Sequence, residues 1–487
     1  MELRSSHLSQ STIPPLHPPT AAKMPDHNSK PAFDVLVVGC GLAGLASALA
    51  LAQAGHRVTV FERSEKLQEL GAGIQLAPNA TRLLARWGVL PEIMKSAERP
   101  DSSACRSYKG DLIAPCLPLH DPALVTAEAP YVVAHRAYLL RALESGIRQD
   151  LSGSVEVKLS SVVQSIDFER TEIQLSDGAV YKGDFILASD GARSKSRAQF
   201  LDFVGNSDAP QTFSTGDVVY RLAVPTEAVL AVGSSHPAYG LATTMSVNMW
   251  MGPGSQAVLY PMQRDMLNVV LTHHEAEDHK PMVGPQKASI EEFRRKIEGW
   301  DHVLQSLTEL EGVVCTKWTL FQIVEQERWT LESGHGRFAL IGDAAHAILP
   351  CLAQGAAQSF EDAGALGGIF DHPISHDQVP DALRVFEQCR RPRASQVRSR
   401  ALAQDTMIGL PDGQAQEDRD AMLRAGGDYG TWKWLWDHDA AEAGRRAWKT
   451  FVTSQNDEQG LLETGKGSEL SVHVAEVLSD SHTPPVW

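Results

Sequence analysis

The chain has 487 residues, of which 43% are hydrophobic and 21% are charged, and this composition excludes disorder, collagen and coiled coil for the bulk of the chain. Its length suggests two or three packed units, because domains usually run to ~100–200 residues. The formal net charge of −16 makes nucleic acid a poor partner, since phosphate binding needs a basic surface. Six cysteines without a Cys-x-x-Cys pair argue against structural zinc and indicate reduced thiols in an intracellular protein.

The first 32 residues are rich in Ser, Pro and His and lack the apolar core of a signal peptide. We expect a solvated leader that does not pack, with a weak targeting role as the alternative. Residues 35–54 are apolar almost throughout and are long enough to suggest a membrane span. Three glycines interrupt them, however, and a second apolar run at 58–61 ends in Glu62. A strand, a tight turn, a helix and a second strand explain the pattern better, because a βαβ unit buried on both faces also reads as continuous hydrophobic sequence.

Further short apolar runs at 185–188 and 338–341 end in turn residues and predict two more strands. Residues 211–275 alternate as strands do, with Gly and Pro at the turns. From 377 to 404 the pattern is helical and Arg-rich, and the acidity of the chain favours a solvated helix face over an anion site. Beyond it, a cluster of aromatic residues predicts a packed C-terminal extension or, as the alternative, a surface for self-association. The cluster comprises Tyr429, Trp432, Trp434 and Trp436.

The most informative motif is Gly39-Cys40-Gly41-Leu42-Ala43-Gly44, which stands between the first predicted strand and helix. Gly39 permits the tight turn, Gly41 lets a pyrophosphate approach the backbone, and Gly44 lets the helix pack closely on the sheet. The N-terminus of that helix offers free N–H groups and a partial positive charge to a diphosphate. Glu62 ends the second strand, where a carboxylate can accept the hydroxyls of an unphosphorylated adenosine ribose. This motif alone does not separate FAD from NAD.

Four further motifs follow in chain order. They are Gly71-Ala72-Gly73-Ile74-Gln75, His135-Arg136-Ala137, Ser189-Asp190-Gly191 and Gly342-Asp343-Ala344-Ala345-His346, the last followed by Gln354-Gly355-Ala356-Ala357. With these five motifs, residues 33–405 resemble the single-component FAD-dependent aromatic hydroxylases of the salicylate hydroxylase and p-hydroxybenzoate hydroxylase type.

The resemblance implies an α/β fold with a Rossmann-like FAD-binding domain of the p-hydroxybenzoate hydroxylase type, a mixed-sheet substrate domain and C-terminal helices. We expect the units to divide the chain into a leader, an FAD-binding domain in two parts, a substrate domain between those parts, and a helical extension. The leader spans residues 1–32, and the two parts of the FAD-binding domain span 33–210 and 330–405. The substrate domain spans 211–329, and the helical extension spans 406–487.

The resemblance also assigns residues to the cofactor. Those implied to hold the ADP half of FAD are Gly39, Gly41, Gly44 and Glu62. Those implied to lie near the ribityl chain and pyrophosphate are Gly73, Arg136 and Asp343. Asp190 and Gly191 match a motif associated with both FAD and NAD(P)H. A helix predicted over 354–368 would bring Gly355 and Ala356 to the flavin pyrimidine, where a helix N-terminus stabilises the anionic reduced flavin.

The reaction implied by the resemblance needs no metal: NAD(P)H reduces FAD, oxygen gives a C4a-hydroperoxide, and a phenolic ring is hydroxylated. A phenolate reacts better than a phenol, so the site should carry a cation or a base. Fungal-type relatives hold the phenolate with an arginine and a tyrosine, and Arg221 and Tyr260 are the candidates here. Tyr220 alternates to the opposite face. The alternatives are an Arg221–Asp217 ion pair and a packing role for Tyr260.

Several choices stay open from the sequence. His346 supports the flavin loop or acts as a general base. The substrate is a phenol of polyketide or other secondary-metabolite biosynthesis, a salicylate-like acid of catabolism, or a non-aromatic polyketide or terpenoid. A flavin-free binding protein of the same fold is disfavoured by the intact glycines, Glu62 and Asp343. We expect small-molecule partners, no membrane span and a cytoplasmic location, and a homodimer is left open.

Overall fold

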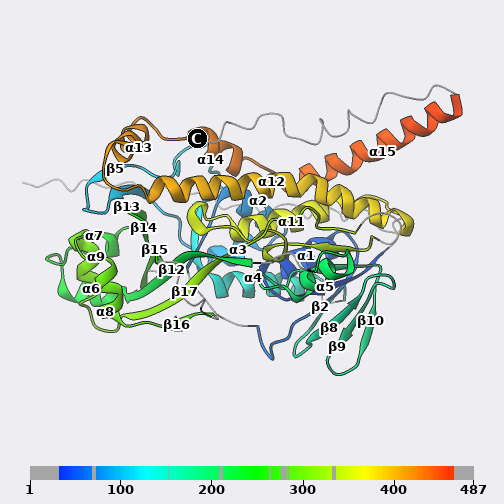
Figure 1. Ribbon diagram of the computed structural model, residues 1–487, viewed down its shortest axis with the longest axis horizontal. Coiled ribbons are helices and arrows are strands. Elements are labelled where there is room, and N and C mark those ends of the chain that lie inside the picture. Colours follow the sequence, from blue (N-terminus) through cyan, green and yellow to red (C-terminus); the bar gives the residue numbers. More distant parts are fainter. Residues whose placement is uncertain are drawn as a thin grey trace, which may run out of the picture.

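The computed structural model describes residues 32–67, 73–151, 153–207, 212–262, 265–275, 282, 284–331 and 336–464. The predicted leader therefore lies outside the described residues except for Ala32, and so does the end of the predicted C-terminal extension, 465–487. Figure 1 shows the elements in two groups side by side, with one long helix, α12 (Val379–Ile408), running along both.

The first group is built on a five-stranded parallel sheet in the order β18-β11-β1-β2-β7. Its strands are β1 (Asp34–Val38), β2 (Arg57–Phe61), β7 (Val155–Lys158), β11 (Phe185–Ala188) and β18 (Phe338–Leu340). The apolar run from residue 35 onward is β1 followed by α1 (Leu42–Gln53), whose first eleven residues are all buried. It is continuous because both faces of the sheet are covered. The membrane interpretation of this run is wrong, and the βαβ interpretation is confirmed.

Helices cover this sheet and join it to the rest of the molecule. Glycine-rich α11 (Gly355–Phe370) packs on α1, α2 and α15. A Cβ on Gly368 would lie 2.1 Å from the Ala441 carbonyl oxygen, so only glycine allows α15 to approach so closely. The helices of this group are α2 (Pro78–Arg86), α3 (Leu90–Met94), α4 (Arg136–Asp150), α5 (Lys195–Phe203), α10 (Asp343–His346), α15 (Ala440–Thr464), and the 3₁₀ turns η2 (Pro350–Leu352) and η3 (His376–Gln378).

Two small sheets accompany the parallel one. An antiparallel meander projects from the molecule in Figure 1 and consists of β8 (Val163–Asp167), β9 (Glu172–Leu175) and β10 (Val180–Lys182). A two-stranded ladder pairs β3 (Gly73–Leu76) with β6 (Val132–His135) and sets Gly73 opposite His135.

The second group is built on an eight-stranded mixed sheet in the order β16-β17-β12-β15-β14-β13-β4-β5. The strands are β4 (Ser102–Ser107), β5 (Leu112–Ala114), β12 (Thr212–Pro225), β13 (Ser246–Gly252), β14 (Ser255–Met262), β15 (Met266–His274), β16 (Gln286–Lys287) and β17 (Val314–Ile323). The strands expected in 211–275 are β12 to β15. The sheet also includes β4 and β5, which the predicted division placed in the FAD-binding part.

Short helices cover one face of this sheet, and the other face turns toward α11 and α12. The covering helices are α6 (Thr226–Val232), α7 (Tyr239–Thr243), α8 (Ile290–Lys296) and α9 (His302–Leu307). Tyr220, Trp250 and Phe293 belong to the apolar core under them. The chain then ends in α13 (Gln414–Arg424), α14 (Tyr429–Trp436) and α15.

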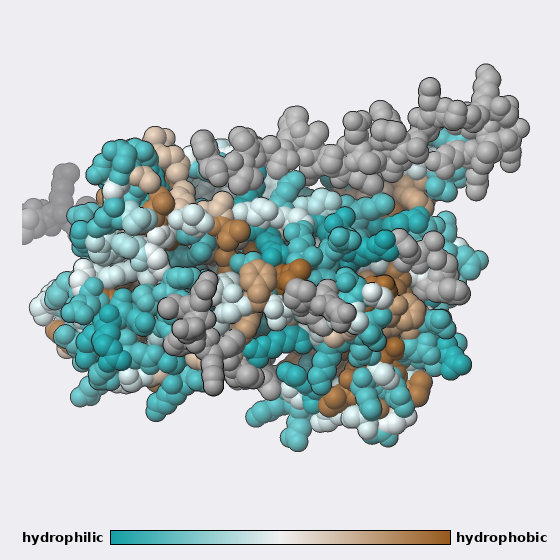
Figure 2. Space-filling view, in the orientation of Figure 1, coloured by the Kyte–Doolittle hydropathy of each residue, from teal (hydrophilic) through white to brown (hydrophobic). Residues whose placement is uncertain are grey.

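Among the described residues, no helix is both long enough and apolar enough to cross a membrane. The face of the molecule in Figure 2 is largely hydrophilic, and hydrophobic residues reach it only in scattered places.

Candidate active site

A cavity of about 450 Å³ lies at the carboxyl ends of β1, β2 and β11. Ligands of open parallel sheets bind at this edge. Of the predicted cofactor residues, those that line it are Gly39, Gly41, Glu62, Arg136, Asp190 and Gly191. We call it the nucleotide cavity.

Three glycines shape its floor, each for a different reason. Gly39 has φ +97°, and a Cβ there would lie 2.8 Å from the Ser189 carbonyl oxygen. A Cβ on Gly44 would lie 2.1 Å from the Gly39 oxygen. A Cβ on Gly41 would meet no atom within 4 Å. Gly39 and Gly44 are thus required for packing, whereas Gly41 leaves open space for a ligand at the N-terminus of α1.

Glu62 is held rigidly at the end of β2. Its carboxylate accepts hydrogen bonds from the Cys40 backbone N–H at 3.0 Å and the Ser64 backbone N–H at 2.9 Å. These bonds fix the side chain on the cavity wall, with acceptor capacity left for ribose hydroxyls. The arrangement is the one that adenosine recognition requires.

Asp190 is also held by its own chain. It accepts hydrogen bonds from Ser194 Oγ at 2.5 Å and from the Ser196 backbone N–H at 3.0 Å. Gly191, at φ +84°, has open space where a Cβ would stand. Asp190 therefore shapes the loop before α5, and the backbone at Gly191 is the part left accessible to a ligand.

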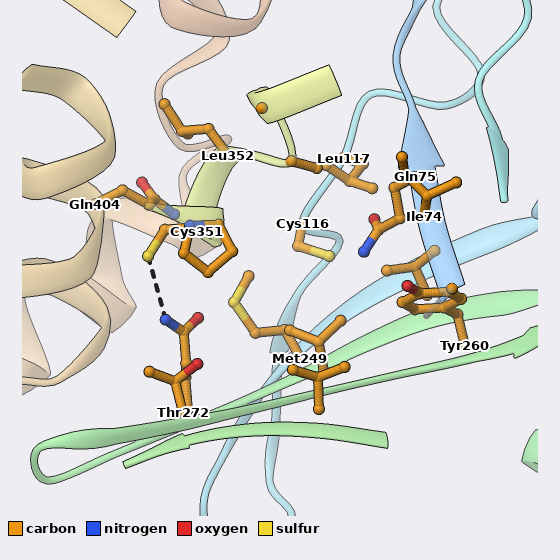
Figure 3. Close-up of a pocket in the computed structure, with 18 of the residues that line it drawn as sticks. Ile74, Gln75, Cys116, Leu117, Met249, Tyr260, Thr272, Cys351, Leu352 and Gln404 are labelled. Atoms are coloured by element: carbon orange, nitrogen blue, oxygen red, sulfur yellow. Dashed lines mark hydrogen bonds between the residues drawn. The ribbon is translucent and has the colours of Figure 1, made fainter. Parts of the chain in front are cut away.

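A second cavity of about 310 Å³ lies between the open face of the eight-stranded sheet and the N-terminus of α11 (Figure 3). We call it the inner chamber. Gly73, Gly355, Ala356 and Tyr260 line it. A Cβ on Gly73 would approach Tyr260 and Met262 to 2.7 Å, while one on Gly355 would meet no atom within 4 Å. No side chain in the described part of the chain caps α11, so its first N–H groups are available to a ligand.

The β3–β6 ladder links the two cavities. Gly73 lines the inner chamber, and Arg136, next in sequence to its ladder partner His135, lines the nucleotide cavity. An elongated dinucleotide could therefore pass along this ladder from one cavity to the other. Open space at Gly41, Gly191 and Gly355, together with two uncapped helix N-termini, fits FAD.

Asp343, predicted to lie near the ribityl chain, stands at the surface. It is exposed as the first residue of α10 and lines neither cavity. The preceding Gly342 has φ +58°, a Cβ there would lie 2.6 Å from the Ala43 Cβ, and its N–H donates to Asp362 at 2.7 Å. The loop is thus pinned against α1, with the Asp343 carboxylate turned to solvent.

Comparison with known proteins accounts for this arrangement. Residues 32–401 match the family described as FAD binding domain. The FAD-dependent monooxygenase OpS4 of Beauveria bassiana is 33% identical over 397 residues, covering 80% of this chain and 88% of its own. The chain belongs to the FAD-dependent monooxygenases. It is also 31% identical over 409 residues to a 3-amino-4-hydroxybenzoate 2-monooxygenase of Streptomyces cremeus, covering 83% of this chain and 95% of that protein.

The fold agrees with this family. A salicylate hydroxylase solved as a substrate complex superposes with a TM-score of 0.70 at 23% identity, covering 86% of this chain and 98% of that one. The predicted α/β fold, the FAD cofactor and the monooxygenase class are therefore confirmed.

In this monooxygenase, Tyr260 and Arg221 lie on the same face of the sheet. Tyr260 is 3% exposed and lines the inner chamber. Arg221 lies on β12, opposite Val270, another chamber residue. Asn268 on the intervening strand β15 accepts a hydrogen bond from Arg221 Nε at 2.7 Å and contacts Tyr260.

The alternative partner of Arg221 is engaged elsewhere. Asp217 accepts a hydrogen bond from His274 Nδ1 at 2.9 Å, whereas Arg221 Nε donates to Asn268. Tyr220 is buried on the opposite face and donates to Glu275 at 2.8 Å, as the alternation predicts.

The Arg-rich helix corrects a second expectation. Arg390 and Arg393 are buried, not solvated. Arg390 binds Asp362 at 2.8 Å and Glu361 at 2.7 Å, and Arg393 binds Glu361 at 2.6 Å. Arginine is suited to such buried pairs because its planar fork binds carboxylates through several N–H groups. The sequence of α12 does not reveal this burial, because the carboxylates that pair with its arginines lie on another helix, α11.

His346 belongs to the same buried network. Its side chain is 5% exposed, Nε2 lies 2.7 Å from Asp362 Oδ2, and the residue lines neither cavity. This geometry supports a structural role for His346 in holding the loop before α11.

Several chamber residues were not predicted. They are Gln75, Tyr131, Gln256, Gln404, Trp432 and Trp436. Gln75 lies two residues after Gly73 in the quoted motif, and this closeness to a predicted site residue was an available signal. Trp432 and Trp436 were assigned to a packed extension, and only the packing of α14 reveals that they also line the chamber. Cys351 lines the chamber too.

Proposed function

We propose that the chain hydroxylates a phenolic ring, with NAD(P)H as electron donor and O2 as co-substrate. One observation carries this proposal: Gln75 and Tyr260 line an otherwise largely apolar chamber that reaches the N-terminus of α11, and a polar row continues from Tyr260 through Asn268 to Arg221 behind them. Apolar pockets with a few convergent polar groups are the usual form of small-molecule sites.

The charges along this row favour an anionic ring oxygen. Burial raises the pKa of Tyr260 well above its ordinary value, so its hydroxyl stays protonated and can donate. Burial lowers the pKa of Arg221, yet an arginine stays cationic near neutral pH. A cation and a hydroxyl donor together lower the pKa of a bound phenol.

When bound and reduced, FAD supplies the oxygen transfer by reaction with O2. The chain's own residues do the rest. Tyr260 donates to the ring oxygen, and Arg221 stabilises its negative charge through Asn268. Met249, Val258 and Leu352 keep water from the chamber, which protects a reactive site from side reactions. The N-terminus of α11 offers N–H groups and a positive dipole to the flavin pyrimidine.

The relative from Streptomyces cremeus is named for a ring that carries a hydroxyl group, which supports a phenolic substrate here. We place the reaction in secondary-metabolite biosynthesis and keep salicylate-type catabolism as the alternative.

We also propose a division of the chain into an FAD-binding part, 33–210 with 330–405, and a substrate part, 211–329. Strands β4 and β5 are added to the sheet of the substrate part.

We also propose a cytoplasmic location. All six cysteines are free thiols, which supports a reducing compartment. A homodimer stays a prediction.

The test is NAD(P)H consumption by the purified yellow protein with a panel of phenols, with hydrogen peroxide assayed alongside. Phenol-stimulated oxidation with little peroxide is the expected result. Bound flavin without stimulation by any phenol would contradict phenol hydroxylation and favour a non-aromatic polyketide or terpenoid substrate.

A further inference from the structure

The inner chamber is not the end of the cavity system. A further cavity of about 350 Å³ lies between β4–β5 and the helices α12, α13 and α14. We call it the outer chamber. The two chambers share the walls Cys116, Leu117, Met249, Leu352, Gln404 and Trp432. In Figure 3, four of these shared residues appear, with Cys116 and Met249 near the centre of the view and Leu117 and Leu352 above them. The chambers therefore adjoin.

The outer chamber is apolar in depth and polar at its rim. Ile113 and Met251 are buried, and the half-buried Met407 and Met422 close the opposite side. Methionine side chains adapt to varied apolar ligands. Arg424, which also lines the chamber, is exposed. A second charged lining residue, the half-buried Asp428, caps the N-terminus of α14 and accepts a hydrogen bond from the Thr431 backbone N–H at 3.1 Å. The buried part of the chamber at Ile113 and Met251 suits hydrocarbon.

The outer wall is specific to the C-terminal part of this chain. Met422 and Trp432 belong to α13 and α14, beyond residue 401, where the family match ends. The nucleotide cavity lies within the matched residues, and so does the inner chamber apart from Gln404 and the tryptophans of α14. The helical side of the outer chamber therefore comes from residues beyond the family match, whereas its β4–β5 side lies within the match.

We propose that the substrate has two parts: a phenolic ring in the inner chamber and an apolar arm of several carbons in the outer chamber. The ring half of this inference rests on the proposed function. The arm half rests on the adjoining walls and their chemistry. Burying an alkyl chain should strengthen binding by up to about fourfold per methylene, until the chain reaches the rim at Arg424.

The probe is a series of 5-alkylresorcinols with chains from methyl to nonyl, bound to the holoenzyme. Dissociation constants come from the change in flavin absorbance and fluorescence, and NAD(P)H oxidation and product are followed in parallel. We expect the dissociation constant to fall about two- to fourfold per methylene and then level off. A flat series would overturn the two-part substrate.

Variants on α13 separate the chamber from non-specific adsorption of longer chains. Met422→Trp should fill the outer chamber and remove most of the gain with chain length. Ala421→Trp, on an exposed position of the same helix, is the matched control and should keep the gain. Met407→Trp, from α12, is a second filling variant in case the first does not fold. Loss of the gain in Ala421→Trp as well, or its survival in both filling variants, would contradict the proposal.

The two proposals can fail separately. Hydroxylation of the methyl compound with no dependence on chain length sinks the arm and leaves phenol hydroxylation standing. Binding that strengthens with chain length, without turnover of any member, supports the outer chamber and contradicts phenol hydroxylation.

Discussion

In the proposed reaction, Arg221 acts on the chamber across one strand, because Asn268 lies between it and Tyr260. A cation at this remove stabilises negative charge without donating directly, and the buried setting strengthens the interaction relative to water. Tyr260 lines the chamber and is the proposed direct donor. The two residues should therefore fail differently when replaced.

We expect Arg221→Ala to lower coupled hydroxylation by roughly 10²-fold, as loss of one anion-stabilising group does elsewhere, while slow NAD(P)H oxidation with peroxide release continues. Tyr260→Phe should instead shift the pH dependence of turnover, because the phenol must then ionise without its hydroxyl donor. Product and peroxide per NAD(P)H are the measurements. Arg295→Ala, exposed on α8, is the control, and unchanged coupling in Arg221→Ala would make that arginine structural.

Asp343 invites a separate experiment because its carboxylate is exposed while its loop is rigidly held. If it binds the ribityl chain, Asp343→Ala should weaken FAD binding by roughly 10- to 100-fold, the worth of one hydrogen bond to a charged group. Flavin content after gel filtration reports this, with Asp202→Ala, exposed on α5, as the control. Full flavin retention would refute the assignment.

Helices α11 and α12 are joined by charge as well as by apolar packing. Arg390 and Arg393 of α12 meet Glu361 and Asp362 of α11, and Asp362 also receives the Gly342 N–H. Helix α12 therefore helps to set the positions of α11 and of the segment that begins at Gly342 and leads into it. Removing one partner of a buried pair strands the other charge, which costs more than the pair itself contributes.

Arg390→Met should accordingly lower the free energy of unfolding by about 3–5 kcal/mol. Urea unfolding of the holoenzyme measures it. Arg391→Met alters the adjacent arginine, which lies 3.5 Å from Glu387 and is partly exposed, and should change stability by less than about 0.5 kcal/mol. Equal effects of the two substitutions would be inconsistent with a buried ion cluster.

The stability of the whole protein should depend on pH through the buried cluster of Arg390, Arg393, Glu361 and Asp362. His438 adjoins this cluster, with Nε2 3.9 Å from Glu361 Oε2. Burial lowers the pKa of His438 to about 3, so below about pH 6.5 the unfolded chain takes up a proton that the folded chain does not. Stability is therefore full above pH 6.5 and falls as the pH drops toward 3. The pKa of Glu361 is held below its ordinary value, chiefly by Arg393 and Arg390 against the effect of burial. Its contribution is lost only below about pH 4.5.

Between pH 6.5 and 5, His438 should cost the wild type about 1–2 kcal/mol. His438→Gln should flatten this slope in thermal or urea unfolding, whereas His120→Gln, at an exposed position, should keep it. A slope that persists in His438→Gln would place the titrating group elsewhere.

The sequence predicted a local arrangement where one continuous segment supplies all of its residues. The Gly39–Gly44 turn with Glu62 is such a case, because strand, turn, helix and acid follow one another. Period-2 alternation also separated Arg221 from Tyr220. The buried state of Arg390 was not predictable, since its carboxylate partners lie on a different helix. The place of Trp432 on the chamber wall likewise depends on how α14 docks.

The strand order also has a consequence for how the protein is made. In the mixed sheet β4 pairs in parallel with β13, and in the parallel sheet β11 pairs with β18. Each sheet therefore needs a strand that lies much later in the chain. Such non-local pairings slow folding and leave strand edges open meanwhile. The ribosome must deliver the chain to β17 (Val314–Ile323) before the mixed sheet is complete, and to β18 (Phe338–Leu340) before the parallel sheet is complete. A nascent chain of this enzyme should therefore depend on chaperones until its second half emerges.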